Sequence, residues 1–205
     1  MTAQVPGAAG YGANANALAA QYESITFAEV YRDLIHLFPA QPASVVDIGA
    51  GSGRDAAALA RLGHHVVAVE PTTELRHEGQ RLHGALPIEW VDDHLPHLKV
   101  LREAQRRFDV VLLTAVWMHL DLQEREMAMQ AITELTADNG QVFMSLRHGP
   151  IPEGRRMFDV SAEETISLAA VHGLSCSHRA EREDMLGRVD VSWSFLALRR
   201  TPAGA

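Results

Sequence analysis

The chain has 205 residues, a formal net charge of −8 and a single cysteine, Cys176. This length suits one ordinary domain with a sizeable core, and the acidic balance argues against a general nucleic-acid binder, which would present a basic face. One cysteine excludes an internal disulfide and a cysteine-based zinc cage. The first residues lack the basic and apolar regions of a signal peptide, and no apolar run reaches membrane-spanning length. We therefore expect a cytoplasmic protein with no membrane partner, whose oligomeric state stays open.

In chain order, residues 1–20 are rich in Ala, Gly and Asn and predict a flexible N-terminal segment, followed by a single domain over residues 21–200. Capping-box spacing at Thr26 and Glu29 predicts a helix that continues to Pro39. Similar signals predict helices over 54–62, 72–83, 98–106, 121–136 and 161–172, with the pair Asn139-Gly140 ending the helix that starts at Asp121. Apolar runs predict strands over 45–48, 66–70, 88–91, 108–115, 141–146, 174–178 and 189–198.

The order of these elements predicts the fold class. Strand and helix alternate five times, and a terminal strand pair follows. The run 108–115 is apolar without alternation, as in a strand buried on both faces in the middle of a parallel sheet. We therefore expect an α/β fold: a doubly wound, mostly parallel seven-stranded sheet with helices on both faces and an antiparallel last strand.

A glycine-rich turn follows the first predicted strand, in the run Asp47-Ile48-Gly49-Ala50-Gly51-Ser52-Gly53. The dinucleotide fingerprint is G-x-G-x-x-G, whereas here the third glycine comes one residue early. A carboxylate at Asp47 would repel a pyrophosphate by about 4 kcal/mol at 4 Å and an effective dielectric near 20. The same carboxylate attracts a cation. The turn therefore favours a nucleoside that carries an ammonium or a sulfonium over a nicotinamide dinucleotide.

A second carboxylate closes the next predicted strand. Glu70 follows the run 66–69 and lies about twenty residues beyond Gly49, the separation at which an acid reaches ribose hydroxyls. Two neighbouring hydroxyls can both donate to one ionised carboxylate. Glu70 is therefore a candidate ligand-binding residue.

Four segments, 45–55, 66–70, 91–93 and 108–119, resemble the class I S-adenosylmethionine-dependent methyltransferases, of the type that acts on small molecules. The resemblance implies S-adenosylmethionine as cofactor, S-adenosylhomocysteine as product, and methyl transfer to a small-molecule nucleophile by in-line displacement, mainly through positioning. It implies a cofactor site in which an acid after the third strand, Asp92 by preference or Asp93, accepts from the adenine amino group. The cofactor-binding residues so implied are Asp47, Gly49, Ala50, Gly51, Gly53, Glu70, Pro71, Asp92, Asp93, Thr114 and Ala115.

The substrate side is less specified. The resemblance places Trp117 and His119 toward the substrate and makes Tyr11 and Tyr22 candidate residues of a cover over the cofactor. Candidates for orienting or deprotonating the substrate are His119 and Arg147, with His148 beside them. Arg147, Arg155 and Arg156 can form a clamp for an anionic group, so an anionic substrate is one expectation. No metal site is predicted, because the pairs His64-His65 and His94/His97 lack further ligands.

Two other functions stay open at this point. One is a non-catalytic module that binds S-adenosylmethionine, and the other is a nicotinamide-dependent oxidoreductase, which Asp47 and the glycine spacing disfavour. The acceptor atom, whether O, N, S or C, and the use of a general base also stay open.

Overall fold

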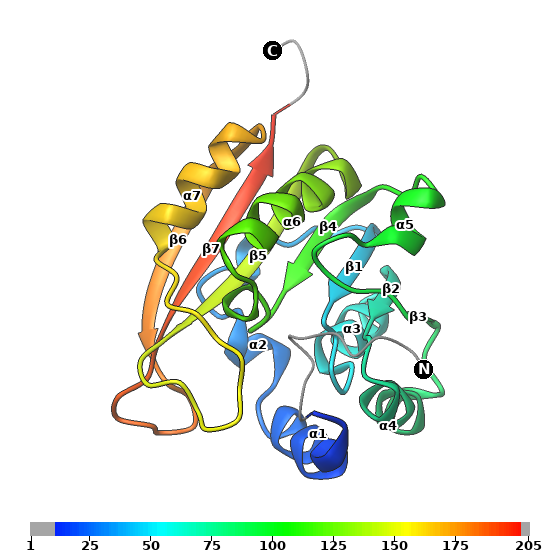
Figure 1. Ribbon diagram of the computed structural model, residues 1–205. Helices are drawn as coiled ribbons and strands as arrows, with labels where there is room; N and C mark the ends of the chain where they lie inside the picture. The colour runs from blue at the N-terminus through cyan, green and yellow to red at the C-terminus, as the bar shows by residue number, and fades with distance from the viewer. Residues whose placement is uncertain (1–10, 202–205) are drawn as a thin grey trace.

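The computed structural model describes residues 11–201 and contains one seven-stranded sheet of order β3-β2-β1-β4-β5-β7-β6 (Figure 1). Strands β1 to β5 pair in parallel, and β7 runs antiparallel to both of its neighbours, β5 and β6. This confirms the predicted fold class. The strands are β1 Ser44–Ile48, β2 His65–Val69, β3 Ile88–Val91, β4 Phe108–Leu113, β5 Thr136–His148, β6 Leu174–Glu183 and β7 Ser192–Arg200.

Helices cover both faces of the sheet because successive strand residues point to opposite sides. Val46 packs in a core with residues of α5, α6 and α7, whereas Val45 packs on the other face with residues of α2 and α3. No helix within residues 11–201 is long and apolar enough to cross a membrane. The helices are η2 Gly12–Asn14, α1 Ala15–Glu23, α2 Phe27–Val30, η3 Ile35–Leu37, α3 Arg54–Arg61, α4 Thr73–His83, α5 Lys99–Glu103, η4 Trp117–His119, α6 Leu122–Leu135 and α7 Ala162–Val171.

The predicted helix starts are confirmed where a capping side chain marks them. Thr26 and Asp121 each form a complete capping box. The side chain of the cap residue accepts from the backbone N–H of the Glu three residues on, and that Glu side chain accepts from the backbone N–H of the cap residue. Ser161 accepts from the backbone N–H of Glu164 at 3.0 Å. These bonds are local in sequence, so the pattern alone is enough to place them.

Several predicted boundaries are wrong, and two of them bear on the site or the sheet: the end of the helix that starts at Thr26 and the end of the helix that starts at Asp121. The helix that starts at Thr26 ends at Val30, and Tyr31 turns its fully buried side chain into the core, where its hydroxyl meets Thr114. At the end of α6, the chain enters β5 directly at Thr136, so Asn139 and Gly140 do not cap the helix. Asn139 instead has a φ of 63° where the pairing register between β4 and β5 shifts, as in a β-bulge.

The N-terminal helix packs over one end of the sheet. Helix α1 contacts α4 (Figure 1), and the buried residues of α1 are Ala15 and Ala19. The segment 1–20, predicted to be flexible, thus contains a helix that begins at residue 15. Residues 1–10 of that segment lie outside the described residues. Because the carboxyl ends of β1, β2 and β4 meet at one sheet edge, the turns after these strands lie together beneath α1.

Candidate functional site

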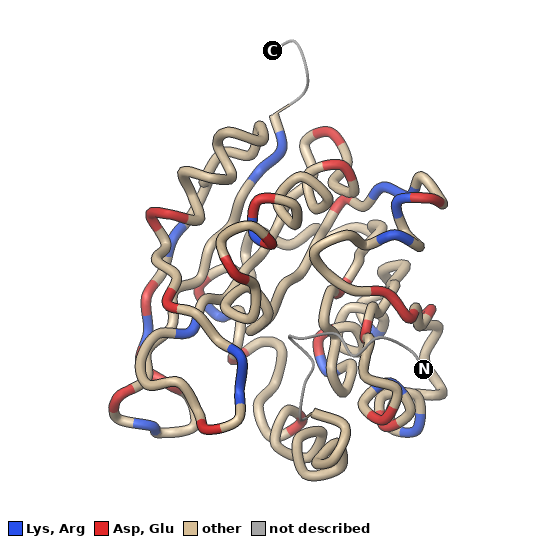
Figure 2. Tube along the Cα trace, viewed as in Figure 1, with Lys and Arg blue, Asp and Glu red and all other residues tan. Residues whose placement is uncertain are grey.

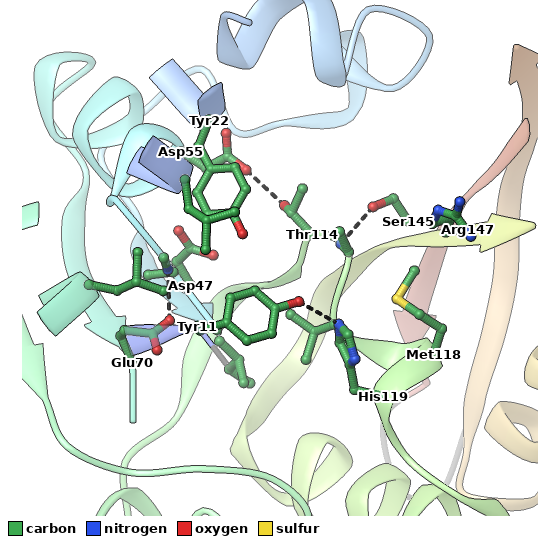
Figure 3. Close-up of a pocket in the computed structure, with 18 of the residues that line it drawn as sticks. Tyr11, Tyr22, Asp47, Asp55, Glu70, Thr114, Met118, His119, Ser145 and Arg147 are labelled. Carbon is green, nitrogen blue, oxygen red and sulfur yellow. Dashed lines mark hydrogen bonds between the residues drawn. The ribbon is translucent and has the colours of Figure 1, made fainter. Parts of the chain in front are cut away.

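A cavity of about 500 Å³ opens at this sheet edge (Figure 3). The turns after β1, β2 and β4 form its base, and Tyr11 and Tyr22 form its cover. Glu23 holds the cover to the base, because its Oε1 accepts from Ser52 Oγ at 2.7 Å and lies 3.1 Å from His83 Nε2. The two tyrosines therefore lie where the resemblance implied. The bridge through Glu23 gave no signal in the sequence.

The glycine turn is built for close approach. Gly49, Gly51 and Gly53 all have positive φ, which residues with a Cβ rarely adopt. A Cβ on Gly49 would lie 2.6 Å from Val116 Cγ2, and one on Gly53 would lie 2.7 Å from the ring of Trp90. The turn thus brings backbone into contact with its neighbours and leaves the space in front of it for a ligand.

Glu70 faces the cavity with acceptor capacity left over. Its Oε2 accepts from the N–H of Gly51 at 2.9 Å, and its Oε1 accepts from the N–H of Thr72 at 2.8 Å. Each carboxylate oxygen has a second lone pair. Burial raises the pKa of Glu70, and the two backbone hydrogen bonds, which lower it, only partly offset that effect. A ligand with two adjacent hydroxyls would supply the donors that the carboxylate lacks.

Asp47 is a buried acid among other acids. Its carboxyl is 2 % exposed, and burial together with the nearby carboxylate of Asp55 holds its pKa well above the usual range. Arg54 opposes that shift, but its guanidinium is committed to Asp55 by bonds of 2.6 and 2.8 Å. The site thus has more negative than positive charge, and a cationic ligand would relieve it.

A buried hydrogen-bond relay supports this wall of the cavity. Thr114 Oγ1 donates to Asp55 at 2.7 Å, so the hydroxyl of fully buried Tyr31, 2.6 Å from Thr114, is the donor to the threonine. Thr114 lines the cavity as the resemblance implied, but its hydroxyl is used by Asp55. The sequence analysis missed Tyr31 and Asp55, whose roles depend on contacts between distant segments.

Ala115 sits in an unusual conformation beside Thr114. Its φ is 57°, a left-handed value for a residue that carries a Cβ, and its N–H donates to Ser145 Oγ at 2.8 Å. Strain of this kind concentrates at functional sites. Ser145 was also missed, although a hydroxyl near the end of the apolar run 142–146 is a usable signal.

The two acids after β3 occupy different environments. Asp93 lines the cavity and is buried, and its oxygens accept from the N–H groups of His94 and Leu101 at 2.9 and 3.1 Å. Asp92 is outside the cavity lining, pairs with Arg76 at 2.9 Å and has a side chain that is 62 % exposed. The geometry favours Asp93 over the residue that the sequence analysis preferred. Pro71 lines the cavity beside Glu70.

The Nε2 lone pair of His119 faces the cavity and the hydroxyl of Tyr11. Its Nδ1 lies 2.7 Å from the carbonyl oxygen of Arg156, which can only accept, so the neutral ring carries its proton on Nδ1. Its Nε2 is then an acceptor, 3.1 Å from the hydroxyl of Tyr11. Burial, with Arg155 and Arg156 adding to it, lowers the pKa of His119. The imidazole is therefore neutral near pH 7 and suited to receive a proton.

The three arginines of the expected clamp have separate roles. Arg147 lines the cavity and is 8 % exposed. The guanidinium of Arg155 stacks 3.8 Å from the ring centroid of Tyr11. Arg156 is paired with Asp121 and Glu124 at 3.0 and 2.7 Å and belongs to the scaffold of α6. The structure thus brings Arg147 and Arg155 to the cavity with their charges unpaired by acids among residues 11–201, whereas Arg156, which is also in the lining, is already paired.

Two further residues do not face the substrate space. Trp117 is fully buried in the core, because the 3-10 turn η4 directs it away and leaves Met118 and His119 on the cavity wall. The expectation for Trp117 is wrong. His148 lies outside the lining, with Nε2 2.8 Å from Ser194 Oγ. Within the described part of the chain, no group of three His, Cys, Asp or Glu side chains could hold a metal ion.

Comparison with solved structures shows the same fold. The chain matches the magnesium protoporphyrin IX methyltransferase of Synechocystis PCC 6803, crystallised with bound SAM (TM-score 0.67, 15% identity, 98% of this chain and 87% of that one). It also matches the Burkholderia thailandensis 1,6-didemethyltoxoflavin-N1-methyltransferase, crystallised with 1,6-didemethyltoxoflavin and S-adenosylhomocysteine (TM-score 0.64, 20% identity, 98% of this chain and 92% of that one). A third match is a TehB-like SAM-dependent methyltransferase of Corynebacterium glutamicum (TM-score 0.65, 18% identity, 90% and 97%).

No curated protein matches the chain in sequence. A family model does: the one described as "Methyltransferase domain" matches residues 22–176, which include the glycine turn, both strand-end acids and His119. This match spans well over half of the chain, and the fold and the cavity agree with it. The chain therefore belongs to the methyltransferase-domain family.

Proposed function

We propose that this protein transfers the methyl group of S-adenosylmethionine to a nucleophilic atom of a small molecule, in the cavity under Tyr11 and Tyr22. The observation that carries the proposal is the pair of buried acids at the ends of neighbouring strands, Asp47 and Glu70, around a turn whose three glycines all have positive φ. Their charge suits a positively charged nucleoside. Solved structures of the same fold with bound SAM or S-adenosylhomocysteine support the choice of cofactor.

We assign each cavity residue to one part of the cofactor. Glu70 has free lone pairs for the ribose hydroxyls, Asp93 lies at the adenine end, and Asp47 supplies negative charge near the amino-acid end. Thr114 and Ala115, the second with a left-handed φ, are proposed to border the same end. When bound, S-adenosylmethionine would supply the methyl group that the acceptor atom takes. The protein contributes mainly position and the exclusion of water, and such positioning lowers barriers by about 7–11 kcal/mol.

For an acceptor that loses a proton, His119 is the proposed general base. Its Nε2 lone pair faces the cavity, and the carbonyl of Arg156 fixes the ring tautomer. The base is neutral because burial lowers its pKa. An acidic group on the substrate belongs to the proposal as well, because Arg147 and Arg155 line the cavity without an acid partner, and Arg147 lies across it from the acids (Figure 3). A cytoplasmic location remains a prediction from the sequence.

Calorimetry tests the cofactor assignment. Wild-type protein should bind S-adenosylhomocysteine and not NAD, and Glu70→Gln should weaken that binding tenfold or more. Glu103→Gln is the matched control, because it removes the same charge from an exposed position on α5. Binding of NAD, or equal affinity in the Glu70 variant and the control, would contradict the site.

Transfer itself needs a second measurement. Incubation with S-adenosylmethionine carrying a labelled methyl group and a panel of metabolites should place label on one compound and release S-adenosylhomocysteine. Tight cofactor binding with no labelled product across extracts and panel would favour a non-catalytic binding module instead.

A further inference from the structure

We propose that the methyl acceptor is an apolar organic acid, and that Arg147 selects it by pairing with its carboxylate. The inference rests on the proposed function, since it assigns a substrate class to the same cavity. Figure 3 shows the relevant asymmetry: Asp47, Asp55 and Glu70 lie on one side of the cavity, and Arg147 lies on the other, beyond Met118 and His119.

Arg147 is a buried charge without a partner. Only 8 % of the residue is exposed, and its Nε is buried with no hydrogen-bond partner. Its single hydrogen bond is a weak one, 3.4 Å from Nη1 to the carbonyl oxygen of Gly149. It forms no ion pair with any acid in residues 11–201. An unpaired buried guanidinium costs stability, so its presence on a cavity wall indicates a ligand that pairs with it.

The nearest acid is already used by other donors. Asp184 accepts from Arg188 at 2.6 and 3.0 Å and from the ring N–H of Trp193 at 2.8 Å. Burial and the charge of Arg188 lower the pKa of Arg147, with only partial opposition from Asp184. An anion from outside the protein would complete the arrangement.

Arg155 provides a second cation in the cavity lining. Its Nη1 is buried with no hydrogen-bond partner within the described residues, while its face stacks on Tyr11. Figure 2 shows the basic positions on the loop after β5 and on the β6–β7 turn, which border this end of the cavity. Both loops also carry acids, among them Glu153 and Asp184, so neither has a net positive charge, and the cation that matters is the unpaired Arg147.

The cavity also has apolar and adaptable lining, which defines the rest of the acid. Trp193 pairs with Arg147 across β5 and β7, and Met118, Met157, Leu186 and Phe195 are in the same lining. Methionine fills irregular space around ligands of varied shape, and the aromatic rings offer flat contact area. A guanidinium fork matches the two oxygens of a carboxylate. The chemistry therefore fits a hydrophobic body that carries one carboxylate.

Calorimetry on protein saturated with S-adenosylhomocysteine tests this with matched probes. Indole-3-acetate and 3-phenylpropionate are compared with their primary amides, which keep the shape and lose the charge. Wild-type protein should bind at least one acid tenfold or more tightly than its amide. In Arg147→Gln that preference should vanish while the affinity for S-adenosylhomocysteine stays within threefold. Arg61→Gln, which removes a charge from an exposed position on α3, should behave as wild type.

Thermal melting separates selection from a structural role. Because Arg147 is unpaired in the ligand-free protein, Arg147→Gln should melt at the same temperature as wild type or higher. A lower melting temperature, equal binding of acid and amide by wild type, no binding of either acid, or a preference that survives in Arg147→Gln would each overturn the proposal. Tighter binding of phenyl phosphate than of the acids would overturn the carboxylate. Failure to bind S-adenosylhomocysteine would instead contradict the proposed function.

Discussion

The hydroxyl of Tyr11 lies 3.1 Å from Nε2 of His119, and thereby links the N-terminal cover to the turn after β4. Since the proton of the neutral ring is on Nδ1, Tyr11 donates this bond and favours the neutral imidazole. Tyr11→Phe should therefore raise the pKa of His119 by up to about one unit, the worth of one hydrogen bond. Nitrogen-detected NMR titration of the ring measures it. An unchanged titration would show that the contact does not form in solution.

The pH dependence of transfer should report His119 in the same way. Because burial lowers its pKa from 6.5, the ring stays neutral at pH 6.5 and above, and activity should fall only as pH drops through the lowered value. Replacing the base should cost about 10²–10⁴ in kcat for an acceptor that loses a proton.

His119→Asn is the variant to measure, with kcat/KM followed from pH 5 to 8. The acidic limb should disappear with the imidazole, and affinity for S-adenosylhomocysteine should stay within threefold. If the limb persists in His119→Asn, another group titrates and His119 is not the base.

Removing the charge of Asp47 should have opposite effects on stability and on binding. Its raised pKa means that the folded protein holds this proton more tightly than the unfolded chain. The resulting stability is fully present below the ordinary pKa of 3.8 and is lost as pH rises through the raised value. Asp47→Asn avoids that loss, so above the raised value its Tm should exceed that of wild type by about 2–4 °C, the shift for about 1 kcal/mol.

The same variant should bind S-adenosylmethionine at least tenfold more weakly. Melting curves from pH 4 to 8, with and without ligand, measure both effects. A variant that is less stable than wild type above the raised value, or that keeps full affinity, would contradict the view of Asp47 as an acid held for a cation.

Asp92 and Asp93 form an internal comparison. Asp93→Asn places an amide opposite two backbone N–H groups that now have a carboxylate partner, so it should cost about 1–3 kcal/mol of stability and weaken S-adenosylhomocysteine binding. Asp92→Asn removes one exposed pair with Arg76 and should change stability by less than about 1 kcal/mol. Urea unfolding and calorimetry of both variants distinguish them. A larger loss of affinity in Asp92→Asn would reverse the assignment.

Features that depend on neighbours in the sequence could be predicted. The capping boxes at Thr26 and Asp121, the glycine turn and the mostly parallel sheet with its antiparallel last strand follow from short-range chemistry and the alternation of elements. The position of Glu70 was also predictable. It directly follows the buried strand β2, so it lies at the carboxyl end of that strand, which is the sheet edge where ligands of this fold class bind.

Features that depend on packing could not. Whether Trp117 or Met118 faces the cavity is decided by a short 3-10 turn whose residues are all buried, so hydrophobicity does not separate them. Arg147, Arg155 and Arg156 look alike in the sequence, and only the positions of Asp121 and Glu124 show which arginine is already paired. The helix from Thr26 stops at Val30 because Tyr31 reaches a partner 83 positions away.

The reversed direction of β7 has a practical consequence for anyone who handles this protein. Since β7 runs against β5, its last residue, Arg200, pairs at the edge of the sheet opposite the cavity, whereas Tyr11 at the other end of the described chain lies within the cavity itself. A purification tag or fluorescent fusion joined after Arg200 therefore lies away from the cavity. One joined directly before Tyr11 would lie beside the cavity.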